Sequence, residues 1–191
     1  MEYILNTVVV GDAYTGKTSI LRRFVHGTYD SEYQPSIGVE YFSKTYNNTK
    51  FSIYDVSGNP RYQTLITNYL KNVIGVIIVI SNTSESLLRA KYFISQVAQQ
   101  NDHHIVYMIL HNKTDLPEEY SDDQLYDFLS EHTHVYYRVS AKKGGDGLEH
   151  AFNNFRMTIM DTVHSDPEHP GVRRKSPPDS PSRSCWDYWW L

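Results

Sequence analysis

Apolar residues along the chain gather in short runs separated by polar segments. Residues 3–10, 73–80 and 105–110 are rich in isoleucine, valine and leucine, which is typical of strands covered on both faces. Residues 40–46 and 51–55 flank a polar segment with paired asparagines, which fits a hairpin turn. The pattern predicts six strands, at residues 3–10, 40–46, 51–55, 73–80, 105–110 and 135–139.

Helical spacing of apolar residues appears between these runs. It covers residues 19–26 and 86–100, and a third segment places Leu148, Ala151, Phe152, Phe155 and Ile159 on one face. Strands that alternate with helices form parallel sheets, because each crossover helix returns the chain to the same end of the sheet. We therefore predict an α/β fold with a mostly parallel six-stranded sheet flanked by helices.

Composition and charge narrow the range of functions. The 191 residues are 40% hydrophobic and 21% charged, as in an ordinary globular domain, and a net charge of −4 gives no electrostatic reason to expect nucleic acid. The single cysteine, Cys185, has no intramolecular disulfide partner, which fits a reducing compartment. The N-terminus lacks a basic region, and residues 73–80 are too short an apolar run to span a bilayer. We expect a cytoplasmic protein.

The composition changes near the C-terminus. Five prolines, at 167, 170, 177, 178 and 181, lie there among serines and charged residues. Such a segment buries too little apolar surface to offset its ordering entropy. We therefore expect one domain over residues 1–163 and a disordered tail over 164–191 that ends in an aromatic cluster.

One loop has the sequence of a nucleotide-binding motif. The first predicted strand is followed by Gly11-Asp12-Ala13-Tyr14-Thr15-Gly16-Lys17-Thr18, in which four residues separate two glycines that precede lysine and a hydroxyl. Backbone N–H groups of such a phosphate loop and the N-terminus of the following helix face an anion. Lys17 then reaches the β- and γ-phosphates, and the Thr18 hydroxyl ligates magnesium. The motif predicts a P-loop NTPase.

Three further elements follow predicted strands. Asp55 can hold magnesium through water, and Gly58, three residues later, can offer its N–H to a γ-phosphate. In Asn112-Lys113-Thr114-Asp115, a carboxylate can accept from both N1–H and the 2-amino group of guanine, which adenine cannot match. Backbone N–H groups of Ser140-Ala141-Lys142 can reach the base carbonyl. Guanine is therefore the expected base.

In this order the motifs resemble those of the Ras superfamily of small GTPases, over about residues 3 to 160, and the Rab branch in particular. Ile37-Gly38-Val39-Glu40-Tyr41 and Arg61-Tyr62-Gln63-Thr64-Leu65 resemble Rab switch segments. The resemblance implies a small G domain that binds GTP or GDP with Mg²⁺ and whose two switch loops are ordered by the γ-phosphate. It also implies an exchange factor, an activating protein and a monomeric state.

The resemblance adds three residues to the site. It implies that Tyr29 packs against guanine, that Tyr33 lies over the phosphates and that Ser36 is a metal ligand. The expected nucleotide contacts are Asp12, Ala13, Tyr14, Thr15, Gly16, Lys17, Thr18, Ser19, Tyr29, Tyr33, Ser36, Gly58, Asn112, Lys113, Asp115, Ser140, Ala141 and Lys142, and the expected metal ligands are Thr18, Ser36 and Asp55.

Two positions depart from the Rab pattern in ways that affect catalysis. Ser36 stands where Rab proteins carry threonine, and Asn59 stands where they carry the glutamine that orients the attacking water. Asparagine is shorter than glutamine by one methylene, about 1.5 Å. We therefore expect Asn59 and Lys17 to act in catalysis and hydrolysis to be slow. A constitutively GTP-bound scaffold or decoy for Rab partners is the alternative; a metabolic kinase is disfavoured because no lid or acceptor site is apparent.

The resemblance also implies an effector surface. Tyr41, Tyr54 and Tyr69 occupy the three aromatic positions that Rab effectors contact. Cys185 has six residues after it and is not in a prenylation motif, so the aromatic end is open to three interpretations: a peripheral membrane anchor on cytoplasmic faces, a docking peptide or a sticky terminus. His111 is expected in a surface or strand-end role.

Overall fold

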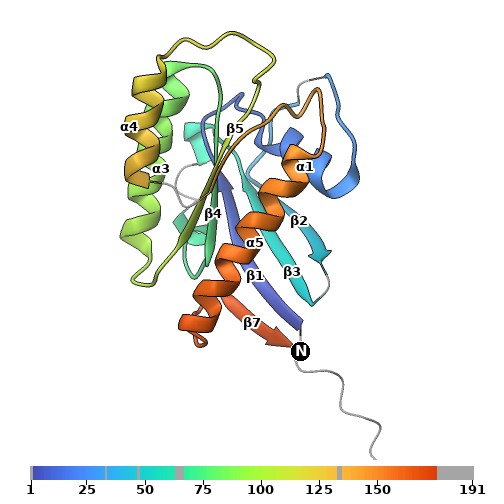
Figure 1. Cartoon of the computed structure of the whole chain (residues 1–191), viewed down its shortest axis with the longest axis vertical. Helices are drawn as coiled ribbons and strands as arrows, with labels where there is room; N and C mark the ends of the chain where they lie inside the picture. The colour runs from blue at the N-terminus through green and yellow to red at the C-terminus, as the bar shows by residue number, and fades with distance from the viewer. Residues whose placement is uncertain (1, 33, 47, 63–66, 133–134, 176–191) are drawn as a thin grey trace, which may run out of the picture.

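The computed structural model describes residues 2–32, 34–46, 48–62, 67–132 and 135–175 (Figure 1). The strands there are β1 (Glu2–Val10), β2 (Val39–Tyr46), β3 (Thr49–Val56), β4 (Gly75–Ile80), β5 (Val106–His111), β6 (Val135–Arg138) and β7 (Val172–Lys175). The helical elements are α1 (Lys17–His26), α3 (Ser84–Gln100), α4 (Asp122–His132), α5 (Gly147–Ser165) and a 3₁₀ turn, η1 (Pro60–Tyr62).

The sheet is mostly parallel, as predicted. Its main path runs β2-β3-β1-β4-β5-β6, in which only β2 is antiparallel to its neighbour. The carboxyl ends of the parallel strands therefore meet at one edge, and the loops that follow β1, β3, β5 and β6 leave from it (Figure 1). The predicted nucleotide motifs occupy these loops, because a ligand site in an open α/β sheet forms outside the carboxyl ends of its strands.

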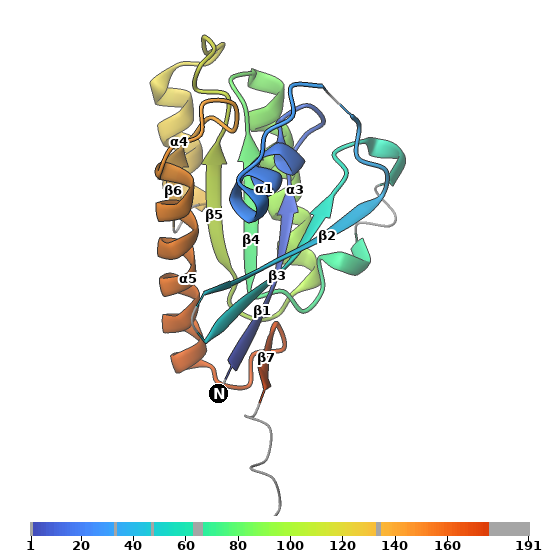
Figure 2. The ribbon, with the colours of Figure 1, turned by 90° about the vertical axis from the view of Figure 1, so that its right-hand side faces the viewer.

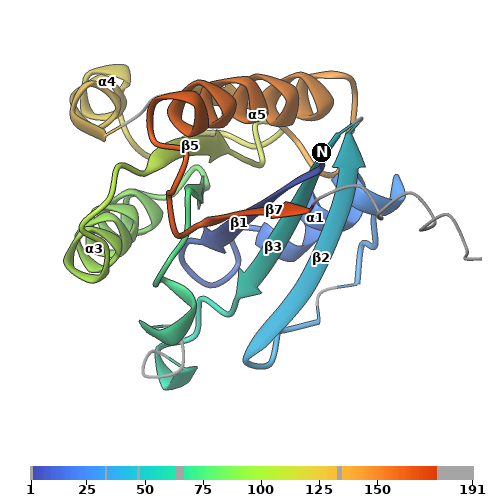
Figure 3. The same cartoon turned by 90° about the horizontal axis from the view of Figure 1, so that it is seen from below.

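Helices cover both faces of the sheet (Figure 3). Side chains alternate across a strand, so Ile77 and Val79 of β4 join the core under α1 and α5, whereas Val76 and Ile78 join the core under α3 and α4. All four of these side chains are fully buried. This two-sided burial explains why β4 is a continuous apolar run. Within the described residues, every helix is too short or too polar to span a bilayer.

The C-terminal part of the domain departs from the prediction. Residues 164–175 are ordered: α5 continues to Ser165, and β7 pairs antiparallel with the first half of β1, below the stretch of β1 that pairs with β4 (Figure 2). A Cβ on Gly171 would lie 2.3 Å from the backbone N of Ile74, so only glycine permits this close approach. The expectation that residues 164–175 are disordered is therefore wrong, because composition carries no signal for backbone pairing. The remaining tail, 176–191, lies outside the described residues.

Candidate functional site

The phosphate loop joins β1 to α1. Its second glycine, Gly16, has a φ of 88°, in the left-handed region that favours glycine. A Cβ at Gly16 would also lie 2.4 Å from Nδ2 of Asn112, in the loop that follows β5. Tyr14 has a φ of 65° with a bulky side chain that is 66% exposed. The loop therefore needs glycine at one left-handed position and carries strain at the other.

Lys17 is a buried cation at the start of α1. Its Nζ donates to the backbone oxygens of Gly11, at 3.1 Å, and Asp12, at 2.8 Å. Burial lowers the pKa of Lys17 to about 8, and the carboxylates of Asp55 and Asp12 oppose that shift. The side chain is mainly protonated at pH 7 and lines a cavity beside the phosphate loop, which we call the phosphate cavity, so it supplies positive charge to an anion there.

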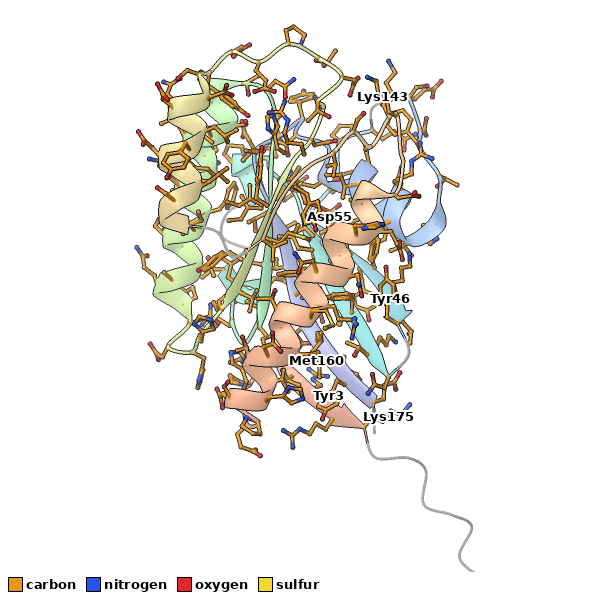
Figure 4. All side chains as sticks on the ribbon, in the orientation of Figure 1. Tyr3, Tyr46, Asp55, Lys143, Met160 and Lys175 are labelled. Carbon is orange, nitrogen blue, oxygen red and sulfur yellow. The ribbon has the colours of Figure 1, made fainter. Side chains whose placement is uncertain are left out.

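The three expected metal ligands meet at one point. The Thr18 hydroxyl donates to Oδ2 of Asp55 at 2.5 Å, and the Ser36 hydroxyl lies 2.7 Å from Thr18 Oγ1. Asp55 is fully buried, far from the end of the molecule where Tyr3 and Lys175 lie (Figure 4). Its Oδ1 has no hydrogen-bond partner among the described residues, and burial raises the pKa of Asp55 to about 6. A buried, unpaired carboxylate oxygen beside two hydroxyls fits a hard cation such as Mg²⁺.

The loop after β3 lies against the phosphate loop. A Cβ on Gly58 would lie 2.4 Å from the backbone N of Ala13, so glycine permits the contact. Asn59 lines the phosphate cavity, but its Oδ1 accepts from the backbone N–H of Arg61 at 3.0 Å. The carboxamide of Asn59 is therefore engaged within its own loop.

Asn112 joins three loops of the site. Its Nδ2 donates to the backbone oxygen of Thr15 at 2.8 Å, and its Oδ1 accepts from the backbone N–H of Ala141 at 3.0 Å. Both hydrogen bonds are buried. The Ala141 N–H is thus already engaged inside the protein, and its predicted contact with the base carbonyl stays a prediction.

Asp115 lines a cavity between the phosphate loop and the loops that follow β5 and β6. Its Oδ1 accepts from the Ser140 hydroxyl at 2.6 Å, and this hydrogen bond holds the pKa of Asp115 below its usual value. Arg23 of α1 fixes the neighbouring loop, since its guanidinium donates to the backbone oxygens of Ala141, at 3.1 Å, and Lys142, at 3.3 Å. Asp115 is therefore ionised and held in place to accept hydrogen bonds from a ligand.

Two adjoining cavities, of about 510 and 240 Å³, gather most of the expected contacts. The larger, phosphate cavity is lined by Ala13, Tyr14, Gly16, Lys17, Thr18, Ser19, Tyr29, Ser36, Gly58, Asn59 and Lys113. The smaller, base cavity is lined by Gly16, Ser19, Tyr29, Asn112, Lys113, Asp115, Ser140, Ala141 and Lys142. Both share Gly16, Ser19, Tyr29 and Lys113, so one extended ligand can occupy the two.

Some expected contacts line neither cavity. The Asp12 side chain faces Arg89 of α3, with an N–O distance of 3.6 Å. The Thr15 hydroxyl is buried and donates to the backbone oxygen of Asp12 at 3.0 Å. Asp55 contacts the Thr18 hydroxyl but lines neither cavity. Tyr33 lies outside the described residues. Asp12 and Thr15 shape the loop through these contacts.

The motifs miss several residues of the site, among them Asp30, Ser31, Glu32, Gln34, Pro35 and Ser57, which line the phosphate cavity. Three others show what the sequence could and could not signal. Arg22 lines the phosphate cavity, Leu116 lines the base cavity, and Arg23 holds the loop of Ala141. Arg22 lies four positions after Thr18, on the same helical face, and this spacing is a signal that the sequence offers. Leu116 and Arg23 follow only from the way the loops assemble.

The three tyrosines expected to contact effectors lie side by side. The ring centroids of Tyr41 and Tyr54 are 5.6 Å apart, and those of Tyr54 and Tyr69 are 5.2 Å apart. Tyr41 is 52% exposed and Tyr69 is 37% exposed, so the cluster forms an aromatic patch on the surface. Gln63, Thr64 and Leu65 of the segment that resembles the second switch lie outside the described residues.

Among the described residues, no group of three or more His, Cys, Asp and Glu side chains is arranged to hold a metal ion.

Comparison with known proteins identifies the family. The Ras family model matches residues 6–161. Ras-related protein Rab-18 of Lymnaea stagnalis is 31% identical over 165 residues, which cover 83% of this chain and 81% of that protein. Ras-related protein Rab-11A of Dictyostelium discoideum is 26% identical, with 88% and 81% covered, and GTP-binding protein ypt3 of Schizosaccharomyces pombe is 28% identical, with 85% and 78% covered. The chain therefore belongs to the Ras family of small GTPases and is similar to its Rab members.

Proposed function

We propose that this chain is a Rab-like switch that binds GTP or GDP with Mg²⁺, recruits effectors in vesicle traffic and hydrolyses GTP slowly. One observation carries the proposal: the hydroxyls of Thr18 and Ser36 meet beside the unpaired carboxylate oxygen of Asp55. Ser36 belongs to the loop before β2, so a cation held at this point ties that loop to the phosphate site. Bound Mg²⁺ supplies neutralisation of phosphate charge. Loss of the γ-phosphate then releases the loop.

Slow hydrolysis is supported by the position of Asn59. Its side chain is about 1.5 Å shorter than glutamine, and its Oδ1 is held by the Arg61 N–H. To orient a water molecule, the carboxamide of Asn59 must break that hydrogen bond. Even then, it reaches less far than the carboxamide of a glutamine would. A misplacement of about 1 Å costs roughly 10²-fold in rate.

The engaged side chain of Asn59 also favours a second candidate function, a constitutively GTP-bound scaffold or decoy for Rab partners. An engaged Asn59 supports both functions. They differ in the response to a Rab-type activating protein, which can itself supply an arginine and a glutamine. Restored hydrolysis favours the switch, and persistent inertness favours the scaffold.

Single-turnover hydrolysis of GTP tests the role of Asn59. We expect Asn59→Gln to hydrolyse GTP roughly 10²-fold faster than the wild type, and Asn59→Ala to be no faster than the wild type. Both variants keep the phosphate loop and the metal ligands intact, so GTP affinity serves as the control. A rate for Asn59→Gln equal to that of the wild type would show that residue 59 does not limit hydrolysis.

The aromatic patch of Tyr41, Tyr54 and Tyr69 is the proposed effector surface. Large exposed aromatic rings at the centre of an interface carry much of its binding energy. We expect GTP-loaded Tyr41→Ala and Tyr54→Ala to lose capture of a Rab effector. Tyr126→Ala is the matched control, because Tyr126 of α4 is 72% exposed and outside the patch. Equal capture by all three variants would exclude this surface.

Localisation is a separate proposal. We place the chain in the cytoplasm as a monomer that works with an exchange factor and an activating protein, and that meets cytoplasmic membrane faces through residues 185–191. Liposome flotation with and without these residues tests the contact. Flotation that does not depend on them would exclude the aromatic end as the anchor.

A further inference from the structure

His111 is a buried histidine that the site chemistry above does not use. It is the last residue of β5, immediately before Asn112, and its side chain is fully buried. Its Nε2 lies 2.8 Å from Asn82 Oδ1 and 3.0 Å from Tyr120 Oη, and its Nδ1 lies 3.2 Å from Tyr136 Oη. Both ring nitrogens therefore have polar partners, and His111 lines neither the phosphate cavity nor the base cavity.

The neighbours of His111 determine which nitrogen carries the proton. The amide nitrogen of Asn82 donates to two backbone oxygens, of Lys113 at 2.9 Å and of Leu116 at 2.6 Å. Oδ1 of Asn82 must then face the ring as an acceptor, so Nε2 of His111 is the donor. The Tyr120 hydroxyl donates to the backbone oxygen of Ser81 at 3.0 Å, which leaves its oxygen to accept from Nε2 as well.

The other nitrogen completes the pattern. With Nε2 protonated, Nδ1 is an acceptor, and the Tyr136 hydroxyl donates to it. Every polar atom around the ring is satisfied by this single neutral tautomer. Burial also lowers the pKa of His111 to about 4, so the ring is neutral at pH 7.

Asn82 connects this ring to the loop that carries Asp115. Its side chain holds the carbonyls of Lys113 and Leu116, on either side of Asp115, and its own backbone oxygen accepts from Glu119 N at 2.8 Å. Lys113 has a φ of 64°, a left-handed conformation that a non-glycine residue adopts only when its surroundings impose it. The path of this loop therefore depends on the orientation of the Asn82 amide.

We infer that His111 is a positioning residue for guanine recognition: its Nε2–H orients Asn82, and Asn82 fixes the loop that presents Asp115 to the base. The inference rests on the proposed base site. A purely structural histidine would stabilise the fold without changing which base is preferred. The two roles differ in the ratio of affinities for GDP and IDP, because inosine lacks the 2-amino group that Asp115 is expected to contact.

The test uses the full chain loaded with fluorescent GDP and Mg²⁺. Release rates of GDP and the GDP-to-IDP affinity ratio are measured for the wild type, His111→Phe and His111→Gln. Phenylalanine keeps the buried ring but removes both polar atoms, whereas the amide nitrogen of glutamine can take the place of Nε2–H. His169→Phe is the matched control, since His169 is also buried and bonded to backbone, near β7 at the opposite end of the sheet.

We expect His111→Phe to release GDP about tenfold faster, the scale of one buried hydrogen bond, and to show a lower GDP-to-IDP ratio. We expect His111→Gln to behave as the wild type, and His169→Phe to lose stability with its release rate and ratio unchanged. Tyr136→Phe is a second, milder variant, because it removes the hydroxyl that donates to Nδ1 and so loosens the ring that donates to Asn82 through Nε2–H. A release rate and ratio unchanged in both His111→Phe and Tyr136→Phe would overturn the inference. A wild type that does not prefer GDP over IDP would overturn the proposed base site and the inference with it.

Discussion

The contact between Gly16 and Asn112 leads to a quantitative prediction. Asn112→Ala leaves the buried backbone oxygen of Thr15 and N–H of Ala141 without partners. Each buried group without a partner costs about 1–3 kcal/mol, so we expect the free energy of unfolding to fall by about 3 kcal/mol. Gly16→Ala places a Cβ 2.4 Å from Asn112 Nδ2, which displaces the same amide. It also puts an L-residue at a φ of 88°, at a cost of about 1–2 kcal/mol.

The two substitutions should therefore not be additive. Gly16→Ala should cost about 4 kcal/mol alone, since it breaks the Asn112 bridge and adds backbone strain. In the Asn112→Ala background the bridge is already gone, so Gly16→Ala should cost only the strain. We expect a coupling energy of about 3 kcal/mol in the double-mutant cycle.

Urea unfolding of nucleotide-free protein in EDTA measures all four forms without a contribution from ligand binding. Far-UV circular dichroism is the suitable probe, because all three tryptophans lie within residues 186–190. Additive losses, with Gly16→Ala equally costly in both backgrounds, would refute the bridge as the reason for glycine at this position.

Three further predictions follow from single residues. Tyr14→Gly should raise the free energy of unfolding by about 1 kcal/mol, since it relieves a left-handed backbone and removes a side chain that is largely exposed; an unchanged thermal midpoint would contradict this. Gly171→Ala should lower the free energy of unfolding by about 1–3 kcal/mol, because its Cβ meets the Ile74 backbone, and hydrogen exchange should rise in β7. Burial lowers the pKa of His111 from 6.5 to about 4, so between these values the unfolded chain holds a proton that the folded chain lacks. As pH falls from 6.5 to 4, the free energy of unfolding of the wild type should therefore fall by up to about 3 kcal/mol more than that of His111→Gln. Urea unfolding at several pH values measures both, and parallel pH profiles would contradict this.

Local patterns allowed much of the fold to be predicted. Each predicted strand overlaps a strand of the sheet. Strands β1, β4 and β5 were visible because a strand that is covered on both faces is apolar along most of its length, and β2 and β3 were visible because a polar turn with paired asparagines separates them. Helix α4 has no counterpart among the predicted elements, although Leu125, Phe128 and Leu129 have helical spacing. Its other residues are mostly polar and acidic, which hides that pattern. Strand β7 offers even less signal, since three of its four residues are charged.

The nucleotide motifs were visible for a related reason. Gly16, Lys17 and Thr18 meet requirements that lie within one turn of backbone, so their spacing alone predicts a phosphate site. The loops after β3, β5 and β6 could be assigned to the same edge because parallel strands end together. The position of these residues in the site therefore depends only on their neighbours in the sequence and on the direction of the strands, both of which the sequence pattern indicates.

Only the tertiary structure decided the contacts between those loops. Asn112 reaches Thr15 across 97 positions of sequence, and His111 reaches Asn82 across 29. Gly171 fits against Ile74 only because β7 lies beside β1. No periodicity or spacing encodes such contacts, because each depends on how separate elements pack together and on which buried polar groups then need partners.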